Sequence, residues 1–170
     1  MSVGQGFWDF SLAVYRQAGV PEECLALQER LGADVNLLLL CAYLGATRNA
    51  VVDRNDIEAA VTASTAWHVD VVRNLRAARQ ALKPWDEGRD KELQDSSRTL
   101  RSAVKKLELD AERIEHDLLA NWANGRNFKL SSPDAAVPAN IRTLVEYYQP
   151  ADNAASPTHL IAAALSLASR

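Results

Sequence analysis

The chain has 170 residues, of which 48% are hydrophobic and 6% aromatic, and its formal net charge is −3. This length suffices for one domain with a buried core, and the abundance of alanine and leucine favours helices over strands. The mild acidity excludes a general attraction to nucleic acid or to an anionic membrane surface. We therefore expect a single all-α domain over residues 1–170.

The surroundings of the cysteines and the residues at the N-terminus indicate the cellular compartment of the protein. Cys24 and Cys41 both lie among apolar residues, which is typical of buried thiols in a reducing environment. The opening "MSVGQGFWDF" lacks the basic and then apolar segments of a secretory signal. We expect a cytoplasmic protein.

Two helices are predicted before residue 33. The stretch "GFWDFSLAVYRQAG" has a broad apolar face that we expect to end at Gly19. The stretch "VPEECLALQERLG" restarts with Pro21 in the first helical turn and stops at Gly32. Each glycine is a natural end signal because it adopts left-handed backbone angles without strain.

The most apolar stretch is "DVNLLLLCAYLGATRNA", at residues 34–50. Asp34 has the side chain of a helix N-cap, and Gly45 is expected to close the helix at about residue 46. The apolar part is much shorter than the roughly 20 residues that a membrane span needs. Because it is apolar on nearly every side, the helix is predicted to lie at the centre of a bundle.

The next helix is expected to begin at "NDIE", residues 55–58, which has capping-box spacing. We expect a pause near residues 64–65 and a continuation from Trp67 to Lys83, where Pro84 ends the pattern. Its inward stripe is Val71, Val72, Leu75, Ala78 and Leu82.

The clearest pattern is a heptad repeat over residues 89–122. Apolar or small residues follow one another at steps of four and three, without an internal glycine or proline, as in a coiled coil. Such a helix would be about 50 Å long, more than a compact domain of this size needs. Either other helices pack along it within the chain, or it meets a partner, for which a homodimer is one form. The heptad positions are Leu93, Ser97, Leu100, Val104, Leu107, Ala111, Ile114 and Leu118.

The C-terminal part is expected to contain a loop, a short helix and a last helix. The loop covers residues 123–138, the short helix begins at Pro138, and residues 149–157 form a linker. Ser156 and Pro157 are expected to start the last helix. The whole chain is thus predicted as a helical bundle of six or seven helices.

Catalytic chemistry is poorly supported. The nearest approach to a helical metal motif is Glu112 with His116, and no second pair of that kind exists. The sequence has no strained serine turn and no phosphate-binding glycine loop. We expect no metal and no cofactor, and the balance leans away from an enzyme.

Two functional hypotheses remain. The first is a non-catalytic interaction or adaptor protein that docks an unidentified acidic protein partner or a phosphate. Residues 73–106 contain ten basic and five acidic residues, which form a basic face. Its core is Arg73, Arg76, Arg79 and Lys83, extended by Arg98, Arg101 and Lys105.

The second hypothesis is a small-ligand-binding protein or an enzyme. Asp9 and Asn36 are polar residues in apolar surroundings, and a buried polar group needs hydrogen-bonding partners. They could bond the nearby backbone, or they could line a pocket together with Tyr43 and His68.

The stretches "FWDFSLAVYRQAGV", "CLALQERLGADVNLLLLCAYLG" and "LRAARQALK" resemble a family of short proteobacterial proteins classed as a domain of unknown function. The resemblance covers about residues 7–120, and the motif "GADVNLLLLC" is its most specific part. It implies a cytoplasmic, mostly helical bacterial protein and carries over no activity and no site residue. Residues 124–170 form an extension beyond the resemblance.

Overall fold

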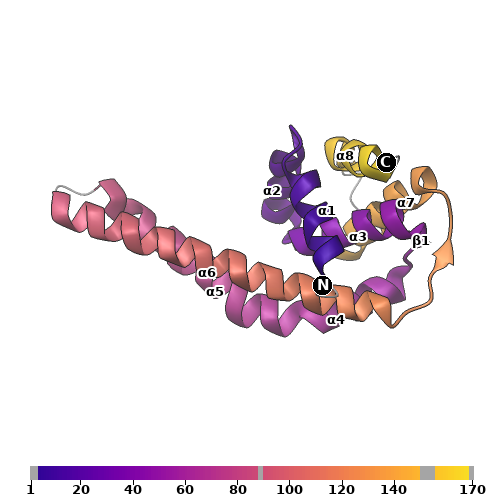
Figure 1. The fold of residues 1–170 in the computed structure, drawn as a ribbon, viewed down its shortest axis with the longest axis horizontal. Coiled ribbons are helices and arrows are strands. Elements are labelled where there is room, and N and C mark those ends of the chain that lie inside the picture. Colours follow the sequence, from indigo (N-terminus) through magenta and orange to yellow (C-terminus); the bar gives the residue numbers. More distant parts are fainter. Residues whose placement is uncertain (1–3, 88–89, 150–155, 169–170) are drawn as a thin grey trace. The chain divides into compact units, whose positions relative to one another are not determined.

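The computed structural model describes residues 4–87, 90–149 and 156–168 and is helical almost throughout (Figure 1). Eight α-helices cover these residues, and α4 (Arg54–Trp67) continues without a break through a π-helical segment (His68–Val72) into α5 (Arg73–Leu82). Counted as continuous rods, they are seven, which agrees with the all-α prediction of six or seven helices. A 3₁₀ turn, η2 (Lys83–Glu87), follows α5.

The remaining elements are α1 (Gln5–Tyr15), α2 (Val20–Leu31), α3 (Val35–Arg48), α6 (Lys91–Asn124), α7 (Pro133–Tyr148) and α8 (Thr158–Ala168). Two strands of two residues each, β1 (Ala50–Val51) and β2 (Lys129–Leu130), pair antiparallel, with Ala50 opposite Leu130. Backbone contacts divide the chain into two compact units. We call residues 1–63 with 116–170 the compact unit and residues 64–115 the hairpin unit.

The compact unit is built around α3. Ten of the 14 residues of this helix are buried, because α7 and α8 cover it along with α1 and α2. Asp34 caps the helix by accepting a hydrogen bond from the Asn36 amide at 2.9 Å, as predicted. Gly32 ends the preceding helix in the left-handed conformation, as its type suggests.

The end predicted for α3 was wrong. The helix runs past Gly45 to Arg48, and Asn49 ends it with a φ of 55°. Gly45 instead lets another helix approach closely, since a Cβ atom at this position would lie 2.8 Å from the Val137 amide nitrogen of α7. The glycine serves packing rather than termination.

Asn140 of α7 links three segments of the compact unit. It is fully buried, and its side-chain oxygen accepts a hydrogen bond from the Val52 amide at 2.9 Å. Its side-chain nitrogen donates to the carbonyl oxygens of Ala50 and Cys41 at 2.8 and 3.2 Å. The turn after α3 is thereby held against α7.

Several predicted helix starts and ends differ from the structure. The first helix ends at Tyr15, and Gly19 lies before α2 with a φ of 83°. At α4 the capping pair is Asp53 and Asp56, whose side chains accept from each other's amides, rather than residues 55 and 58. The expected pause at residues 64–65 is absent, and the backbone widens into the π-helical segment a few residues later.

The C-terminal helices also begin elsewhere than predicted. Ser132 and Pro133 start α7, so that Pro138 lies inside the helix. The last helix begins at Thr158, and a carboxylate from α2 caps it: Glu23 accepts hydrogen bonds from the His159 and Leu160 amides at 3.0 and 2.9 Å. The start predicted at residue 89 for the long helix, and most of the linker at 149–157, lie outside the described residues.

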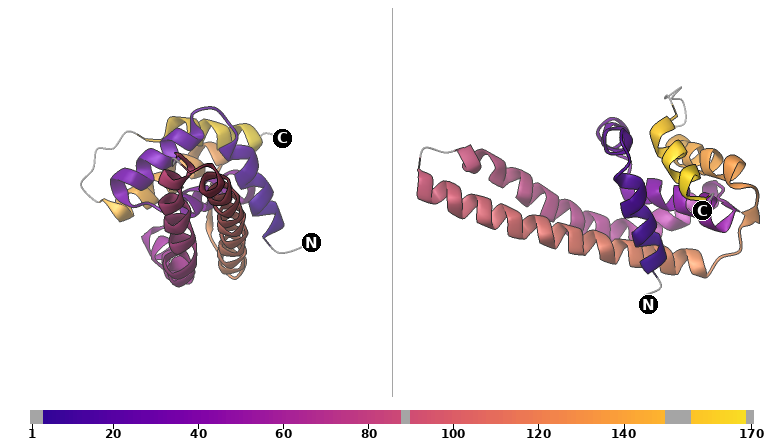
Figure 2. Two further views of the ribbon diagram at one scale, coloured as in Figure 1. Left: turned by 90° about the vertical axis from the view of Figure 1, so that its left-hand side faces the viewer. Right: turned by 45° about the horizontal axis from the view of Figure 1, so that its top comes forward.

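In the hairpin unit α5 and α6 lie side by side, as Figure 1 and both views of Figure 2 show. No residue of α5 is fully buried. Polar bonds hold the two rods together: the Trp67 indole donates to the Ala111 carbonyl at 2.9 Å, and the Ser97 hydroxyl to the Leu82 carbonyl at 3.3 Å. Among the described residues, no helix combines the length and the apolar character that crossing a bilayer requires.

Candidate functional site on the helical hairpin

An ion-pair network joins the middle of α5 to α6. The Arg76 guanidinium contacts Glu108 at 3.0 Å and Glu112 at 2.9 Å, and Arg79 also pairs with Glu108. All of these side chains are at least three-quarters buried, with exposed fractions of 8% to 25%. The two arginines of the predicted basic face that point toward α6 are therefore occupied within the unit.

The pKa values of the two glutamates shift in opposite directions. Burial disfavours the charged form of both, but hydrogen bonds from Arg79 and Arg76 outweigh it at Glu108 and hold the pKa of that carboxyl below its ordinary value. At Glu112 burial prevails over the attraction of Arg76, and the negative charge of Glu108 adds to it, so that its pKa is raised. Glu108 is thus the fixed anion of the network.

Three other predicted members of the basic face lie at the surface. Arg73 is exposed at the start of α5, Lys83 at the start of η2, and Lys105 on α6. Asp86 of η2, the 3₁₀ turn that follows α5, binds side chains of α6. Its carboxylate accepts hydrogen bonds from Arg101 at 2.7 Å and from the Ser97 hydroxyl at 3.0 Å. Arg98 donates to the Asp86 main-chain carbonyl at 2.9 Å.

A second feature of the hairpin unit is a row of exposed apolar side chains on α6. Four residues at the same heptad position are 45% to 54% exposed, whereas the alternate positions Ser97 and Ala111 are buried. The other half of the heptad seam is thus covered at these two positions, whereas Val104 is half-buried and Leu118 is 36% exposed. We call these four residues the apolar row: Leu93, Leu100, Leu107 and Ile114.

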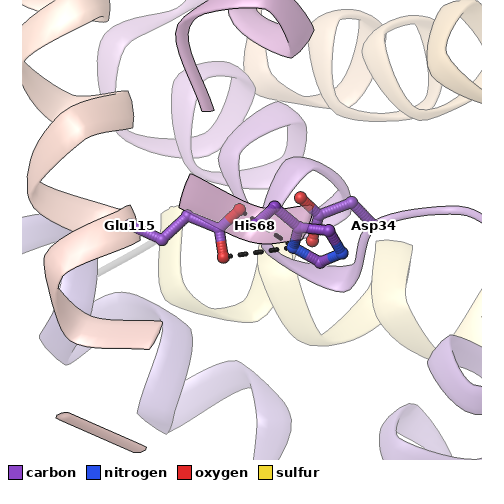
Figure 3. Close-up of side chains that lie close together, drawn as sticks. All are labelled: Asp34, His68 and Glu115. Carbon is purple, nitrogen blue, oxygen red and sulfur yellow. Dashed lines mark hydrogen bonds and ion pairs between the residues drawn. The ribbon is translucent and has the colours of Figure 1, made fainter. Parts of the chain in front are cut away.

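A histidine–glutamate pair lies at the base of the hairpin unit (Figure 3). His68 Nδ1 is 3.1 Å from a carboxylate oxygen of Glu115, which is fully buried. Asp34, also drawn in Figure 3, belongs to the compact unit, where it caps α3 and its amide donates to the Tyr148 hydroxyl at 3.2 Å. His68 was among the residues predicted from the sequence to line a pocket, whereas Glu115 was not, because it resembles the other acidic residues of the long helix.

The pocket predicted from Asp9, Asn36, Tyr43 and His68 draws on both units. Asp9 is exposed, contrary to the expected burial, and accepts a hydrogen bond from Gln5 at 2.7 Å. Asn36 is buried in the first turn of α3. Tyr43 packs on Phe7 and Phe10 with ring centroids 5.1 and 5.4 Å away.

Three further residues that could take part in chemistry are buried: His116, Cys24 and Cys41. His116 is buried in the compact unit, stacked 4.4 Å from Phe7, and its Nε2 atom lies 3.1 Å from the Ser11 hydroxyl. Burial raises the pKa of the Cys24 and Cys41 thiols to about 12, so both remain protonated at neutral pH and are poor nucleophiles.

Comparison with known proteins adds a family and no activity. Residues 6–119 match the family described as "Protein of unknown function (DUF2390)". Neither a curated protein nor a solved structure matches the chain. The match ends within α6, so that α7 and α8, which cover α3, lie beyond it.

Proposed function

The chain belongs to this family of unknown function, and we propose that it is an interaction protein whose hairpin unit pairs with a second copy of the same chain. The observation that carries the proposal is the apolar row on α6. Large apolar side chains at regular heptad spacing on a helix are typical of a surface that another helix covers.

The hairpin unit by itself does not bury these side chains. Its two helices meet through the neighbouring flank of α6, where Ser97, Glu108 and Ala111 are buried. Leu100 and Leu107, in the middle of the row, are 53% and 54% exposed. Covering the row with another helix would remove this apolar surface from water, which is the main favourable contribution to association.

The row matches a second copy in the antiparallel direction. A two-fold axis between residues 103 and 104 would set Leu93 opposite Ile114, and Leu100 opposite Leu107, of the other chain. Each apolar residue then meets an apolar residue, and the contact is the same on both chains.

Charge along the flank of the row supports the same direction. Seven-residue steps on this flank read Glu92, Thr99, Lys106 and Arg113, from acidic to basic. Antiparallel pairing brings Glu92 near Arg113 of the second copy, whereas parallel pairing sets like charges beside each other.

The acidic protein partner expected from the sequence is the second part of the proposal. Arg76 and Arg79 serve the fold by holding Glu108, so reversing their charge would disturb the hairpin unit itself. Arg73 and Lys83, which are exposed, are the better candidates for contact with such a partner.

The test is the oligomeric state of the full chain. Light scattering coupled to size exclusion should give twice the 18.7 kDa chain mass for the native protein. The double variant Leu100→Asp with Leu107→Asp should elute as a monomer with unchanged circular dichroism. Leu109→Asp is the matched control, since Leu109 is 41% exposed but lies on another side of α6. A monomeric native protein, or a control that dissociates equally, would contradict the proposal.

The small-ligand hypothesis has less support. Asp9 faces solvent and bonds within its own helix, and Tyr43 is packed among phenylalanines. No contact described within either unit brings the four residues of that hypothesis together.

A further inference from the structure

The tip half of the hairpin unit holds a cavity of about 260 Å³ between η2, α5 and α6. Its walls consist of six polar side chains, all within one unit. Four of them are cationic and one is a carboxylate. The lining residues are Arg79, Asp86, Arg98, Arg101, Ser102 and Lys105.

The charges in this cavity do not cancel. Asp86 is the single carboxylate of the lining, and its oxygens already accept hydrogen bonds from Ser97 and Arg101. Arg79 is paired outside the lining with Glu108. After these two pairs the cavity keeps an excess of two positive charges, contributed by Arg98 and Lys105. Arg98 donates to the uncharged Asp86 main-chain carbonyl, and its ion pair with Asp95, at 3.6 Å, is exposed.

One hydrogen-bond donor of the lining has no partner. Arg101 Nε is buried and makes no hydrogen bond, a condition shared among the described residues only with the Trp122 indole nitrogen. Buried donors are nearly always paired in folded proteins, and an unpaired one calls for an explanation such as a missing ligand. Arg101 already uses one terminal nitrogen on Asp86, so its Nε edge is the one left to bond.

The size and chemistry of the cavity favour a small oxyanion. Its volume lies just below the range of about 300–1,000 Å³ that is usual for drug-sized ligands. Guanidinium groups bind the oxygens of phosphate with two parallel hydrogen bonds, and an ammonium group adds a point charge. The Ser102 hydroxyl can donate a further hydrogen bond. A metal cation would be repelled by the same set.

We propose that this cavity is a binding site for a phosphate group, held by Arg98, Arg101 and Lys105 with Ser102. The site does not depend on the pairing of two chains through the apolar row. The phosphate group is either inorganic phosphate or a phosphomonoester, because both present the same oxygens.

The test is isothermal titration of the full chain with inorganic phosphate and, separately, with O-phosphoserine, in a buffer free of other oxyanions. Saturable binding of either is expected, and the tighter one identifies the source of the phosphate. Sodium chloride at the same ionic strength should give no saturable heat. Absence of saturable binding for both phosphates would overturn the proposal.

Variants localise the binding. Lys105→Ala should weaken it roughly tenfold or more, the usual effect of losing a charged hydrogen bond. Lys106→Ala is the matched control, since Lys106 is also exposed but is absent from the lining. Arg101→Lys keeps the charge but removes Nε and should also weaken binding. Equal affinities of the two lysine variants for phosphate would place the phosphate elsewhere and overturn the assignment. Circular dichroism should be unchanged in every variant, which shows that a loss of binding is not caused by unfolding.

Discussion

The two units of the chain use different means to hold helices together. In the compact unit, other helices surround α3 and pack closely against it, as α7 does where Val137 meets Gly45. In the hairpin unit, arginine and glutamate side chains connect the rods while leucines face outward. A buried apolar centre specifies one arrangement through shape, whereas the hairpin is joined by charge and leaves apolar side chains exposed.

Among variants that test this difference between the units, Asn140→Leu is expected to lower the free energy of unfolding most. Leucine has a similar size but leaves the Val52 amide and the carbonyls of Ala50 and Cys41 without partners. We expect a loss of roughly 3–5 kcal/mol in the free energy of unfolding, measured by urea denaturation. A loss below about 1 kcal/mol would mean that the compact unit is no more strictly specified than the hairpin unit.

A smaller effect is expected from Gly45→Ala. The added methyl group would meet the Val137 backbone at 2.8–2.9 Å, so α7 must move away from α3. Overpacking of this kind costs about 1–3 kcal/mol in unfolding free energy. Gly6→Ala is the control, because the added atom would find only the Tyr43 hydroxyl, at 3.5 Å, within 4 Å. Equal stabilities of the two variants would contradict the close approach of α3 and α7.

The smallest effect is expected in the hairpin unit, from Glu108→Gln. The folded-state pKa of Glu108 lies below its ordinary value of 4.5, so the carboxylate stabilises the fold above that pH. This stabilisation is lost as the pH falls through the lowered pKa. We expect the variant to be roughly 1–2 kcal/mol less stable than the native protein at pH 7. The difference should shrink toward zero in acid, and a difference independent of pH would show that charge does not join these helices.

The sequence predicted features that depend on local chemistry. Asp34 and Gly32 behave as expected because a cap or a left-handed turn involves residues two to four positions apart. Gly45 and Pro138 were misread because their roles depend on distant packing or on a competing local signal. Gly45 meets a helix about ninety residues away, and Ser132 with Pro133 starts α7 before Pro138 is reached.

The candidate site was predictable in part. The spacing of basic residues indicated a basic face, and the heptad repeat indicated a helix-pairing surface. Neither pattern reveals that Glu108, 29 residues from Arg79, occupies part of that face, or that Asp86 gathers Arg98 and Arg101 around a cavity. Likewise the repeat does not tell which half of the seam is covered. These facts depend on how two separate rods are aligned. The single domain expected over the whole chain stays a prediction, which one cooperative transition in calorimetry would support.

The dependence of α3 on α7 has a consequence for the order in which the chain acquires structure during synthesis. Cys41 and Asn140 are 99 positions apart, so their bond forms only after most of the chain has been made. The hairpin unit, at residues 64–115, is already complete in sequence by then. A growing chain at that stage lacks the cover that α7 and α8 give to the leucines of α3, and a chain truncated before residue 133 would still lack it. Such a nascent chain is a natural substrate for chaperones, which bind transiently exposed apolar segments.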